Sequence, residues 1–323
     1  MGAEVAQDAG RGDVVVPINF DARVGDAERR QRLYAGEIFV YSPTPAGKAL
    51  CEFARAMSAE AFRPLDPRTA QHSLAVERYA AILAELKPAF IHHPESKRLI
   101  RELLAAFGCD SKETYFDVPR LRTSTSSGFL TTGIAYAFHP HRDTWYSAPP
   151  CQLNWWLPVY DLVSNDGLAF HPTYWSRPVK NGSRRYNYAE WNRTSRKVAA
   201  QQIGEDTRDQ PKPDEPMDLD GEVRPLCAAG GLILFSAAQM HSSVENTSGR
   251  TRLSVDFRTV NLRDVEELHG APNVDSACTG TTMADYLCCE DLEHVPQPLV
   301  ERYEAGILTV SKTVSKTPTD TRR

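Results

Sequence analysis

The spacing of hydrophobic positions changes near residue 110 and divides the chain into two parts. Over residues 71–108, apolar side chains recur at helical spacing and prolines at positions 88 and 94 interrupt the pattern, which predicts two helices. Before them, the run 37–41 predicts a strand, and the turn and capping residues at 42–45 predict a helix that follows it. The first third of the chain is therefore expected to be a strand with a helical flank.

Beyond Thr114 the pattern consists of short β-rich runs separated by Gly, Pro, Asn and Asp. We expect strands at residues 114–116, 133–138, 151–160, 167–170, 223–227, 232–235 and 252–260. Strands and helices do not alternate in this part, which argues against a doubly wound parallel sheet. The runs instead favour a mainly β core of the double-stranded β-helix kind, a jelly-roll or cupin-like architecture with flanking N-terminal α-helices.

The expected organisation is one domain with four parts. Residues 1–30 form a flexible lead-in, 31–110 the strand and helical flank, 111–265 the catalytic core, and 266–323 a C-terminal extension with a helix near 299–305 and a frayed tail. An insert at 175–221 interrupts the core. Its first half is basic and aromatic, whereas its second half is too polar and proline-rich to pack and is expected to be a surface excursion.

Composition and charge exclude several classes of function. The net charge of −5 provides no global positive field for a nucleic acid. The chain has no signal-peptide pattern and no run of about 18 apolar residues, so we expect a cytoplasmic protein that does not enter a membrane. Its seven cysteines are odd in number and scattered, which predicts reduced thiols. The composition and charge fit a soluble enzyme that acts on a small-molecule substrate and that can form a homo-oligomer.

His141 and Asp143 form a His-x-Asp pair directly after the strand expected at 133–138. Residues i and i+2 of an extended chain point the same way, so both side chains can reach one metal ion. Two imidazoles and one carboxylate form the ligand set of non-haem iron(II) sites that keep positions open for a keto acid and dioxygen. The pair alone is a weak signal, because such short matches arise by chance, so a second histidine must come from another strand.

His241 supplies that histidine, shortly after the apolar run 231–235. Arg252 follows His241 by eleven residues, the length of a hairpin, so a returning strand can direct a guanidinium at the metal site. Such a permanently charged fork suits the distal carboxylate of a keto acid.

These residues resemble the phytanoyl-CoA hydroxylase-like branch of the iron(II), 2-oxoglutarate-dependent dioxygenases. The resemblance rests on residues 161–172, where a strand ends at a proline, and on two motifs, His141-x-Asp143 and His241-x-Ser243-x-x-Asn246-x-Ser248-x-x-x-Arg252. It implies iron(II) on His141, Asp143 and His241, and 2-oxoglutarate anchored by Arg252 with Ser243 or Ser254 assisting. It also implies hydroxylation of a small molecule with release of succinate and CO2.

Several assignments stay open at this point. Gln152, Asn154 and Trp156 alternate along one strand face, and they are our substitutes for the Lys or Thr that often assists in such enzymes. Arg250 and Arg258 share parity with Arg252 and are alternative anchors. His139 precedes His141 by two residues and is an alternative metal ligand, although this choice leaves Asp143 without a role.

The substrate is expected to be an anionic, polar metabolite. The basic-aromatic half of the insert carries Arg184, Arg185 and Tyr186 where jelly-roll dioxygenases have substrate-covering loops, and arginine forks pair with carboxylates and phosphates. The alternative is a solvated helix face neutralised by the acidic half. His171 and Trp156 are further candidates for substrate contact, and each has a structural alternative.

Two other classes of protein fit the same residues. A cupin-like metal-binding protein without 2-oxoglutarate oxygenase activity needs the metal ligands but not a buried guanidinium, so Arg252 discriminates against it. The third class is a β-sandwich scaffold in which the three ligands never meet.

Overall fold

The strands of the described chain form two sheets. The structure is a computed structural model, and it describes residues 16–305. The larger sheet has eight strands in the order β1-β2-β7-β5-β9-β3-β10, with β4 also paired to β9, and the smaller sheet pairs β6 with β8. The strands are β1 (Ile18–Phe20), β2 (Ile38–Tyr41), β3 (Thr114–Phe116), β4 (Arg120–Ser124), β5 (Leu153–Pro158), β6 (Leu168–Phe170), β7 (Leu232–Ser236), β8 (His241–Ser243), β9 (Arg252–Asn261) and β10 (Leu287–Cys288).

Strand β9 is the centre of the large sheet. It pairs with β5 along one edge, and with β4 and then β3 along the other, all antiparallel. Only β1 and β2 are paired in parallel, so the sheet is mixed. This pairing brings Arg120 of β4 opposite Asp256 of β9, and Asn154 of β5 opposite Arg258, two residues further along β9.

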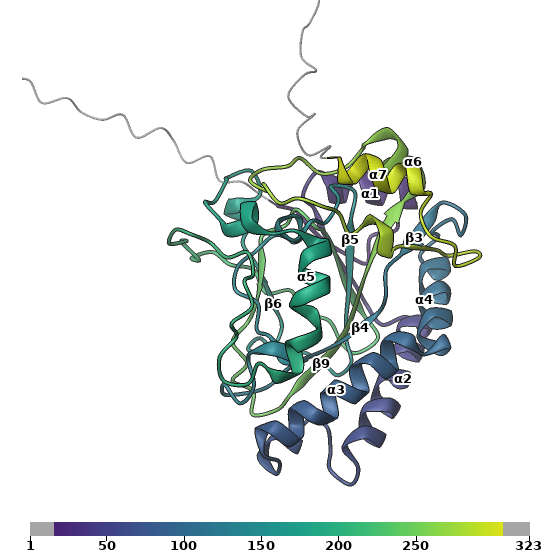
Figure 1. The fold of residues 1–323 in the computed structure, drawn as a ribbon. Coiled ribbons are helices and arrows are strands. Elements are labelled where there is room, and N and C mark those ends of the chain that lie inside the picture. Colours follow the sequence, from purple (N-terminus) through teal and green to yellow (C-terminus); the bar gives the residue numbers. More distant parts are fainter. Residues whose placement is uncertain (1–15, 306–323) are drawn as a thin grey trace, which may run out of the picture.

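The helices surround these sheets. The α-helices are α1 (Asp26–Tyr34), α2 (Pro45–Phe62), α3 (Val76–His92), α4 (Pro94–Ala106), α5 (Tyr188–Thr194), α6 (Leu262–Glu267) and α7 (Gln297–Glu304). Helices α2, α3 and α4 gather on one side of the molecule, whereas α1, α6 and α7 lie together at one end (Figure 1). The hydroxyl of Thr44 accepts the Gly47 N–H at 3.0 Å and caps α2, as the capping signal predicts.

The main hydrophobic core lies between the large sheet and the helical flank. Trp155 of β5 and Phe257 of β9 are buried in it together with apolar residues of α2, α3 and α4. Successive residues of a strand point to opposite faces. The neighbours Asn154 and Trp156 on β5, and Asp256 on β9, therefore point to the other face, which carries the functional side chains.

Six of the eight strands expected from the sequence correspond to β2, β3, β5, β6, β7 and β9. The strand expected at 133–138 is wrong, because a 3-10 helix spans Gly133–Ala135 and the left-handed φ of +58° at Gly133 breaks the extended run. The strand expected at 223–227 is also wrong. It contains Pro225, which has no N–H group, and only Val223 forms a bridge, with Phe170.

Other differences concern the less regular segments. β1 lies inside the expected lead-in, and β4, β8 and β10 were not among the strand ranges expected from the pattern. In the acidic half of the insert, Gln210 is buried, and the ion pair between Asp206 and Arg208 is almost inaccessible to solvent. The start of this half, residues 206–211, is therefore packed against the rest of the structure, whereas most of residues 212–220 are exposed, as expected of a surface excursion. The tail expected after residue 305 lies outside the described residues.

The fold prediction is confirmed in its coarser form: a large mixed sheet with several helices, including the expected helices before residue 110 and α7 near the C-terminus. Helices account for more of the described chain than a mainly β protein implies. None of the described helices is long and apolar enough to cross a membrane.

Candidate functional site

His141 and His241 lie directly opposite each other across an antiparallel bridge. The backbone N–H of each donates to the carbonyl oxygen of the other, both at 2.9 Å. Residues paired in this way project their side chains to the same face, and the two ring centroids are 4.3 Å apart. The expected hairpin between His241 and Arg252 is wrong, since β8 pairs with β6 and β9 belongs to the large sheet.

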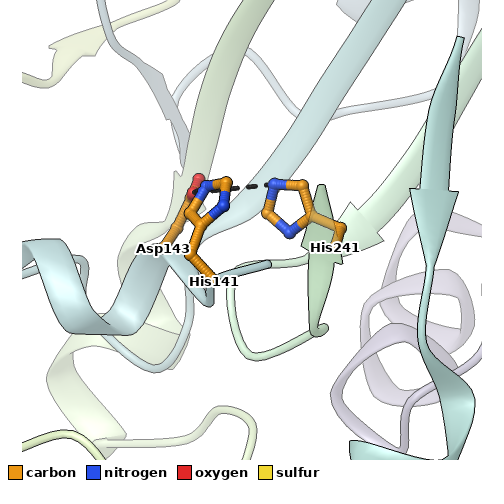
Figure 2. A group of neighbouring side chains, drawn as sticks. All are labelled: His141, Asp143 and His241. Carbon is orange, nitrogen blue, oxygen red and sulfur yellow. Dashed lines mark ion pairs between the residues drawn. The ribbon is translucent and has the colours of Figure 1, made fainter. Parts of the chain in front are cut away.

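Asp143 reaches the same point from the start of a 3-10 helix, Asp143–Tyr146. Its Oδ1 atom lies 3.4 Å from Nε2 of His141 and 3.8 Å from Nε2 of His241. Figure 2 shows the carboxylate and the two rings converging from the turn and from β8, and one ligand atom from each residue lies within 4.8 Å of the others. The three residues meet, so the scaffold alternative is wrong.

The backbone fixes which ring nitrogen of each histidine is free. Nδ1 of His141 lies 2.8 Å from the carbonyl oxygen of His139, and Nδ1 of His241 lies 3.0 Å from that of Gln239. A carbonyl oxygen only accepts, so each Nδ1 carries a proton and each Nε2 presents a lone pair towards Asp143. Two such imidazoles and one carboxylate fit iron(II) and leave coordination positions open.

Local electrostatics keep these groups in the protonation states that bind a cation. Burial and the neighbouring His141 lower the pKa of His241 to about 3, so its ring is neutral at neutral pH. Burial of Asp143 opposes its ionisation, but the neighbouring His141, His241 and Arg258 hold the pKa of this carboxyl below its usual value. The carboxylate is therefore charged.

His139 is not placed as a metal ligand. Its Nδ1 lies 3.2 Å from the hydroxyl of Tyr136, and its Nε2 lies 2.7 Å from the carbonyl oxygen of Pro211. Both ring nitrogens are engaged, so the contacts favour the pair of His141 with Asp143 over the pair of His139 with His141.

Gln152 and Asn154 lie beside Asp143. Nε2 of Gln152 donates to Oδ2 of Asp143 at 3.1 Å and to Oδ1 of Asn154 at 2.8 Å. The hydroxyl of Tyr286 donates to Oε1 of Gln152 at 2.7 Å. Gln152, predicted as a 2-oxoglutarate contact, thus bonds directly to a candidate metal ligand.

Arg252 is buried without an acidic partner. Its Nε donates to the carbonyl oxygen of Asp166 at 2.9 Å, one terminal nitrogen donates to Oγ of Ser254 at 2.6 Å, and its guanidinium lies 5.2 Å from the ring centroid of Trp156. Within residues 16–305, no carboxylate lies within ion-pair distance of it. Burial lowers the pKa of Arg252 to about 10; the charges of Asp166 and Asp256 oppose this shift, but neither carboxylate is a direct counter-charge within ion-pair distance. A carboxylate of 2-oxoglutarate would supply one.

The two alternative arginines are placed differently. Arg250 is exposed. Arg258 lines the cavity, but its nitrogens lie 3.5 Å from Asp117, 3.3 Å from Asp256 and 3.9 Å from Asp143. Burial of Arg258 opposes its charge, but these three carboxylates raise its pKa. Arg252 is therefore the better anchor for an incoming anion.

One cavity of about 340 Å³ contains this whole arrangement. Charged residues from β4 and β9 line it, together with Asn154 and Trp156 of β5. Tyr186, Tyr188 and Trp191 of the insert line it from another side. Lys87 of α3 also contributes. Its ammonium donates to the carbonyl oxygen of Ile134, and burial together with Arg122 lowers its pKa to about 7.

The structure brings only some of the predicted substrate contacts to this cavity. Trp156 and Tyr186 line it. Arg184 and Arg185 are exposed and do not, and Nε of Arg185 lies 3.6 Å from the exposed Asp209. His171 is buried outside the cavity lining, with its Nε2 3.0 Å from Oγ of Ser242.

Sequence reasoning missed several residues of the site. Lys87, Arg120, Arg122 and Asp256 line the cavity, and Tyr286 bonds to Gln152. The alternation of Arg120 and Arg122 was a usable signal, since two basic residues on one face of a buried strand are rare without a partner or ligand. Lys87 and Tyr286 carry no comparable local signal.

Comparisons with known proteins agree with the motifs. The profile of the phytanoyl-CoA dioxygenase (PhyH) family matches residues 40–254. No curated protein matches the chain.

Solved structures that are similar share little sequence with this chain. EvdO2 from Micromonospora carbonacea var. aurantiaca is 15% identical over 54% of this chain and 62% of its own length, with a TM-score of 0.34. The chain thus spans less than two thirds of EvdO2. The non-haem monooxygenase ThoJ is 15% identical over 78% of this chain and 80% of its own, with a TM-score of 0.40. The α-ketoglutarate-dependent epimerase SnoN from nogalamycin biosynthesis is 15% identical over 73% and 84%, with a TM-score of 0.35.

Likenesses this distant carry no argument about reaction or substrate. The family match covers most of the chain and contains both motifs, and it confirms the recognition made from them. The predicted enzyme class, a non-haem iron oxygenase, and the predicted cofactors, iron and 2-oxoglutarate, are those of this family, and the cluster of His141, Asp143 and His241 fits the metal. The chain belongs to the phytanoyl-CoA dioxygenase family.

Proposed function

We propose that this chain is an iron(II)- and 2-oxoglutarate-dependent dioxygenase that hydroxylates a small anionic molecule and releases succinate and CO2. One observation carries the proposal. A ligand set of two histidines and one aspartate shares a cavity with Arg252, a buried cation without an acidic partner in the described chain. Iron, when bound by His141, Asp143 and His241, supplies dioxygen activation coupled to decarboxylation of 2-oxoglutarate.

The proposal includes the architecture. In a double-stranded β-helix, two sheets enclose a site between them. Antiparallel pairing throughout β5, β7 and β9 supports this reading, as does a small β6–β8 sheet that carries a ligand into the same cavity.

Arg252 receives the distal carboxylate of 2-oxoglutarate in this proposal. Oγ of Ser254 holds the guanidinium in place, and Ser243, on the strand β8 that carries His241, lines the same cavity. Lys87 is the second cation for the same anion. The charge of Arg252 contributes to the lowered pKa of Lys87 and that of Asp256 opposes it, but no carboxylate of the described chain lies within ion-pair distance of Lys87.

The charge of the cavity favours an anionic substrate. The lining holds three carboxylates, Asp117, Asp143 and Asp256, against seven cationic residues, Lys87, Arg120, Arg122, Arg196, Arg208, Arg252 and Arg258. Of the seven, Arg208 is paired with Asp206 outside the lining. The two charges of an iron(II) ion and those of a 2-oxoglutarate dianion balance each other, so the positive excess remains. Uncompensated charge in a desolvated site is costly, and a substrate anion would remove that cost.

Arg120, beside Arg258, is the proposed contact of the substrate anion. The two arginines share Asp117 as an ion-pair partner, so two guanidinium groups meet one carboxylate. Arg258 is six residues from Arg252 on the extended strand β9, about 20 Å along it, so the substrate and 2-oxoglutarate would be held at separate ends of the cavity. The metal ligand Asp143 lies close to Arg258.

The aromatic side of the cavity suits a flat or apolar substrate body. Tyr146 lies 5.5 Å from the ring of His141 and 5.4 Å from that of Tyr186, and Tyr186 lies 6.3 Å from Trp191, measured between centroids. These rings form a continuous wall from the candidate metal ligand to the insert. We therefore propose a substrate with an aromatic or apolar body and one anionic group.

A screen for 2-oxoglutarate-dependent succinate release tests the function and the charge together. Each candidate carboxylic acid is assayed beside its neutral carboxamide. We expect iron-dependent succinate release that responds to acids and not to amides, and we expect Arg120→Leu to weaken this response. The double variant Arg184→Ala, Arg185→Ala is the control, because it removes two positive charges outside the cavity. If the response to acids were lost in this control and kept in Arg120→Leu, the anion would bind at the insert instead.

The rival function is a cupin-like metal-binding protein without oxygenase activity. It leaves Arg252 and Lys87 unexplained, since a barrel without a keto-acid co-substrate has no use for two buried cations near its metal. Iron binding without 2-oxoglutarate binding would favour it.

A further inference from the structure

The family profile ends at residue 254, but the candidate site does not. Tyr286 lies far beyond that point and reaches the site by a hydrogen bond to Gln152. We propose that Tyr286, acting through Gln152, orients the Asp143 carboxylate so that one oxygen faces the metal position. The C-terminal segment that contains Tyr286, residues 275–288, is then part of the metal site. This inference rests on the proposed function only for the identity of the metal ion.

The two oxygens of Asp143 have separate partners. Oδ1 faces the Nε2 atoms of His141 and His241, at 3.4 Å and 3.8 Å. Oδ2 accepts the hydrogen bond from Gln152 at 3.1 Å and lies 3.9 Å from Nε of Arg258. A carboxylate held by its second oxygen offers a metal ion one ligand atom, which leaves room for other ligands.

Gln152 can serve this purpose only in one orientation of its amide. An amide has a donor end and an acceptor end of similar shape. Because the Tyr286 hydroxyl donates to Oε1, the NH2 end faces Asp143 and Asn154, both of which offer it an oxygen. The reversed amide would place its oxygen against two other oxygens. Burial raises the pKa of Tyr286 far above its ordinary value, so the hydroxyl keeps the proton that it donates.

Further contacts hold the C-terminal segment against residues 141–147, the turn that carries His141 and Asp143 and is called the metal-ligand turn below. Oγ of Ser276 donates to the carbonyl oxygen of Thr144 at 2.6 Å, and Oγ of Ser147 donates to that of Thr279 at 2.8 Å. The backbone N–H of Thr282 donates to the carbonyl oxygen of Ser147 at 3.1 Å. Tyr286 therefore follows a segment that is already attached to the turn, which sets the position of its hydroxyl.

Metal affinity tests this positioning role without turnover. The full-length protein is freed of metal and titrated with cobalt(II), followed by the visible absorption of the bound ion. Substitution of a residue behind a metal ligand typically costs about 10- to 100-fold in affinity, and we expect losses in this range for Tyr286→Phe and Gln152→Met. The control is Tyr303→Phe, which removes another buried hydroxyl of the C-terminal region. This hydroxyl donates to the carbonyl oxygen of Val265 at 3.2 Å and lies 3.9 Å from Sγ of Cys151, but it makes no hydrogen bond to Gln152. The affinity of this control variant should match that of the wild type.

A double variant separates positioning from general stability. If Tyr286 acts through Gln152, adding Tyr286→Phe to Gln152→Met causes little further loss of affinity, whereas independent effects would add. Additive losses, or a Tyr286→Phe variant that melts at lower temperature but binds cobalt(II) like the wild type, would overturn the inference. A wild-type protein that binds no cobalt(II) would overturn the metal site itself and this inference with it. If the variants bound cobalt(II) as tightly as the wild type, the inference about Tyr286 would be wrong, but the proposed function would not be affected.

Discussion

Arg142, the residue between the metal-ligand candidates, forms a fully buried ion pair with Asp275. Its Nε lies 3.1 Å from Oδ1 and 3.3 Å from Oδ2 of Asp275. The indole N–H of Trp145 donates to the same carboxylate at 2.7 Å, and the backbone N–H of Val179 donates to it at 3.0 Å. One carboxylate thus joins the metal-ligand turn, the insert and the C-terminal segment.

Asp275→Ala should destabilise the fold strongly. It leaves the Arg142 charge buried without its partner, and breaking a buried pair in this way typically costs about 3–5 kcal/mol. Urea denaturation measures the loss. The matched control is Asp209→Ala, which removes a carboxylate from an exposed pair with Arg185 and should cost at most about 1 kcal/mol. Equal losses in the two variants would contradict the structural role of Asp275.

The metal ligands were predictable because their signal is short and local. His141, Asp143 and His241 follow a fixed motif, and Arg252 stands at a fixed distance from His241. What brings them together was predicted less well. The expected geometry was a strand followed by a hairpin, whereas the structure uses a bridge between the two histidines and a crossing between two sheets. The motif fixes the residues, and the backbone route depends on long-range pairing.

The rest of the site depends on contacts that the sequence does not express locally. Arg120 and Arg122 enter the cavity through the register of β4 with β9, and Tyr286 meets Gln152 across 134 residues. The insert at 175–221 shows a second reason why the sequence was not sufficient. Its local composition indicated a basic and aromatic surface, but composition does not show direction, and Tyr186 faces the cavity while Arg184 and Arg185 face solvent.

Arg252→Ala should impair the co-substrate much more than the metal. A lost charge-assisted pair in a buried site is worth about 3–5 kcal/mol, which corresponds to a rise of roughly a hundredfold or more in the 2-oxoglutarate concentration required. Cobalt(II) affinity without 2-oxoglutarate should stay close to that of the wild type. Arg250→Ala removes an exposed guanidinium two residues away and serves as the control. If Arg258→Ala produced the larger rise instead, the anchor would be Arg258.

The affinity for 2-oxoglutarate should fall as the pH rises above 7. The pKa of Lys87 is lowered to about 7, first by burial and then by Arg122, with Arg252 adding to the effect and Asp256 opposing it. Below that pH the ammonium is charged and attracts the dianion, and above it the affinity falls by up to about tenfold per pH unit. Isothermal titration between about pH 6 and pH 9 measures this, since the carboxyls of 2-oxoglutarate stay ionised throughout.

Two variants of Lys87 give the corresponding controls. Lys87→Arg keeps a positive charge at every pH, so it should retain affinity and lose the dependence on pH. Lys87→Met should bind weakly at all of these pH values. A wild-type affinity that is constant with pH, or a dependence that persists in Lys87→Met, would show that another group is responsible.

The most direct test of the account is anaerobic titration of the metal-free protein with iron(II) in the presence of 2-oxoglutarate. The visible charge-transfer band of the iron complex reports when both bind at one site. We expect the wild type to bind one iron(II) ion per chain and to develop the band on addition of 2-oxoglutarate, and we expect His241→Ala to fold normally and develop no band. Development of the band in His241→Ala with unchanged stoichiometry, or its absence in the wild type, would contradict the assignment of His141, Asp143 and His241 as the metal centre.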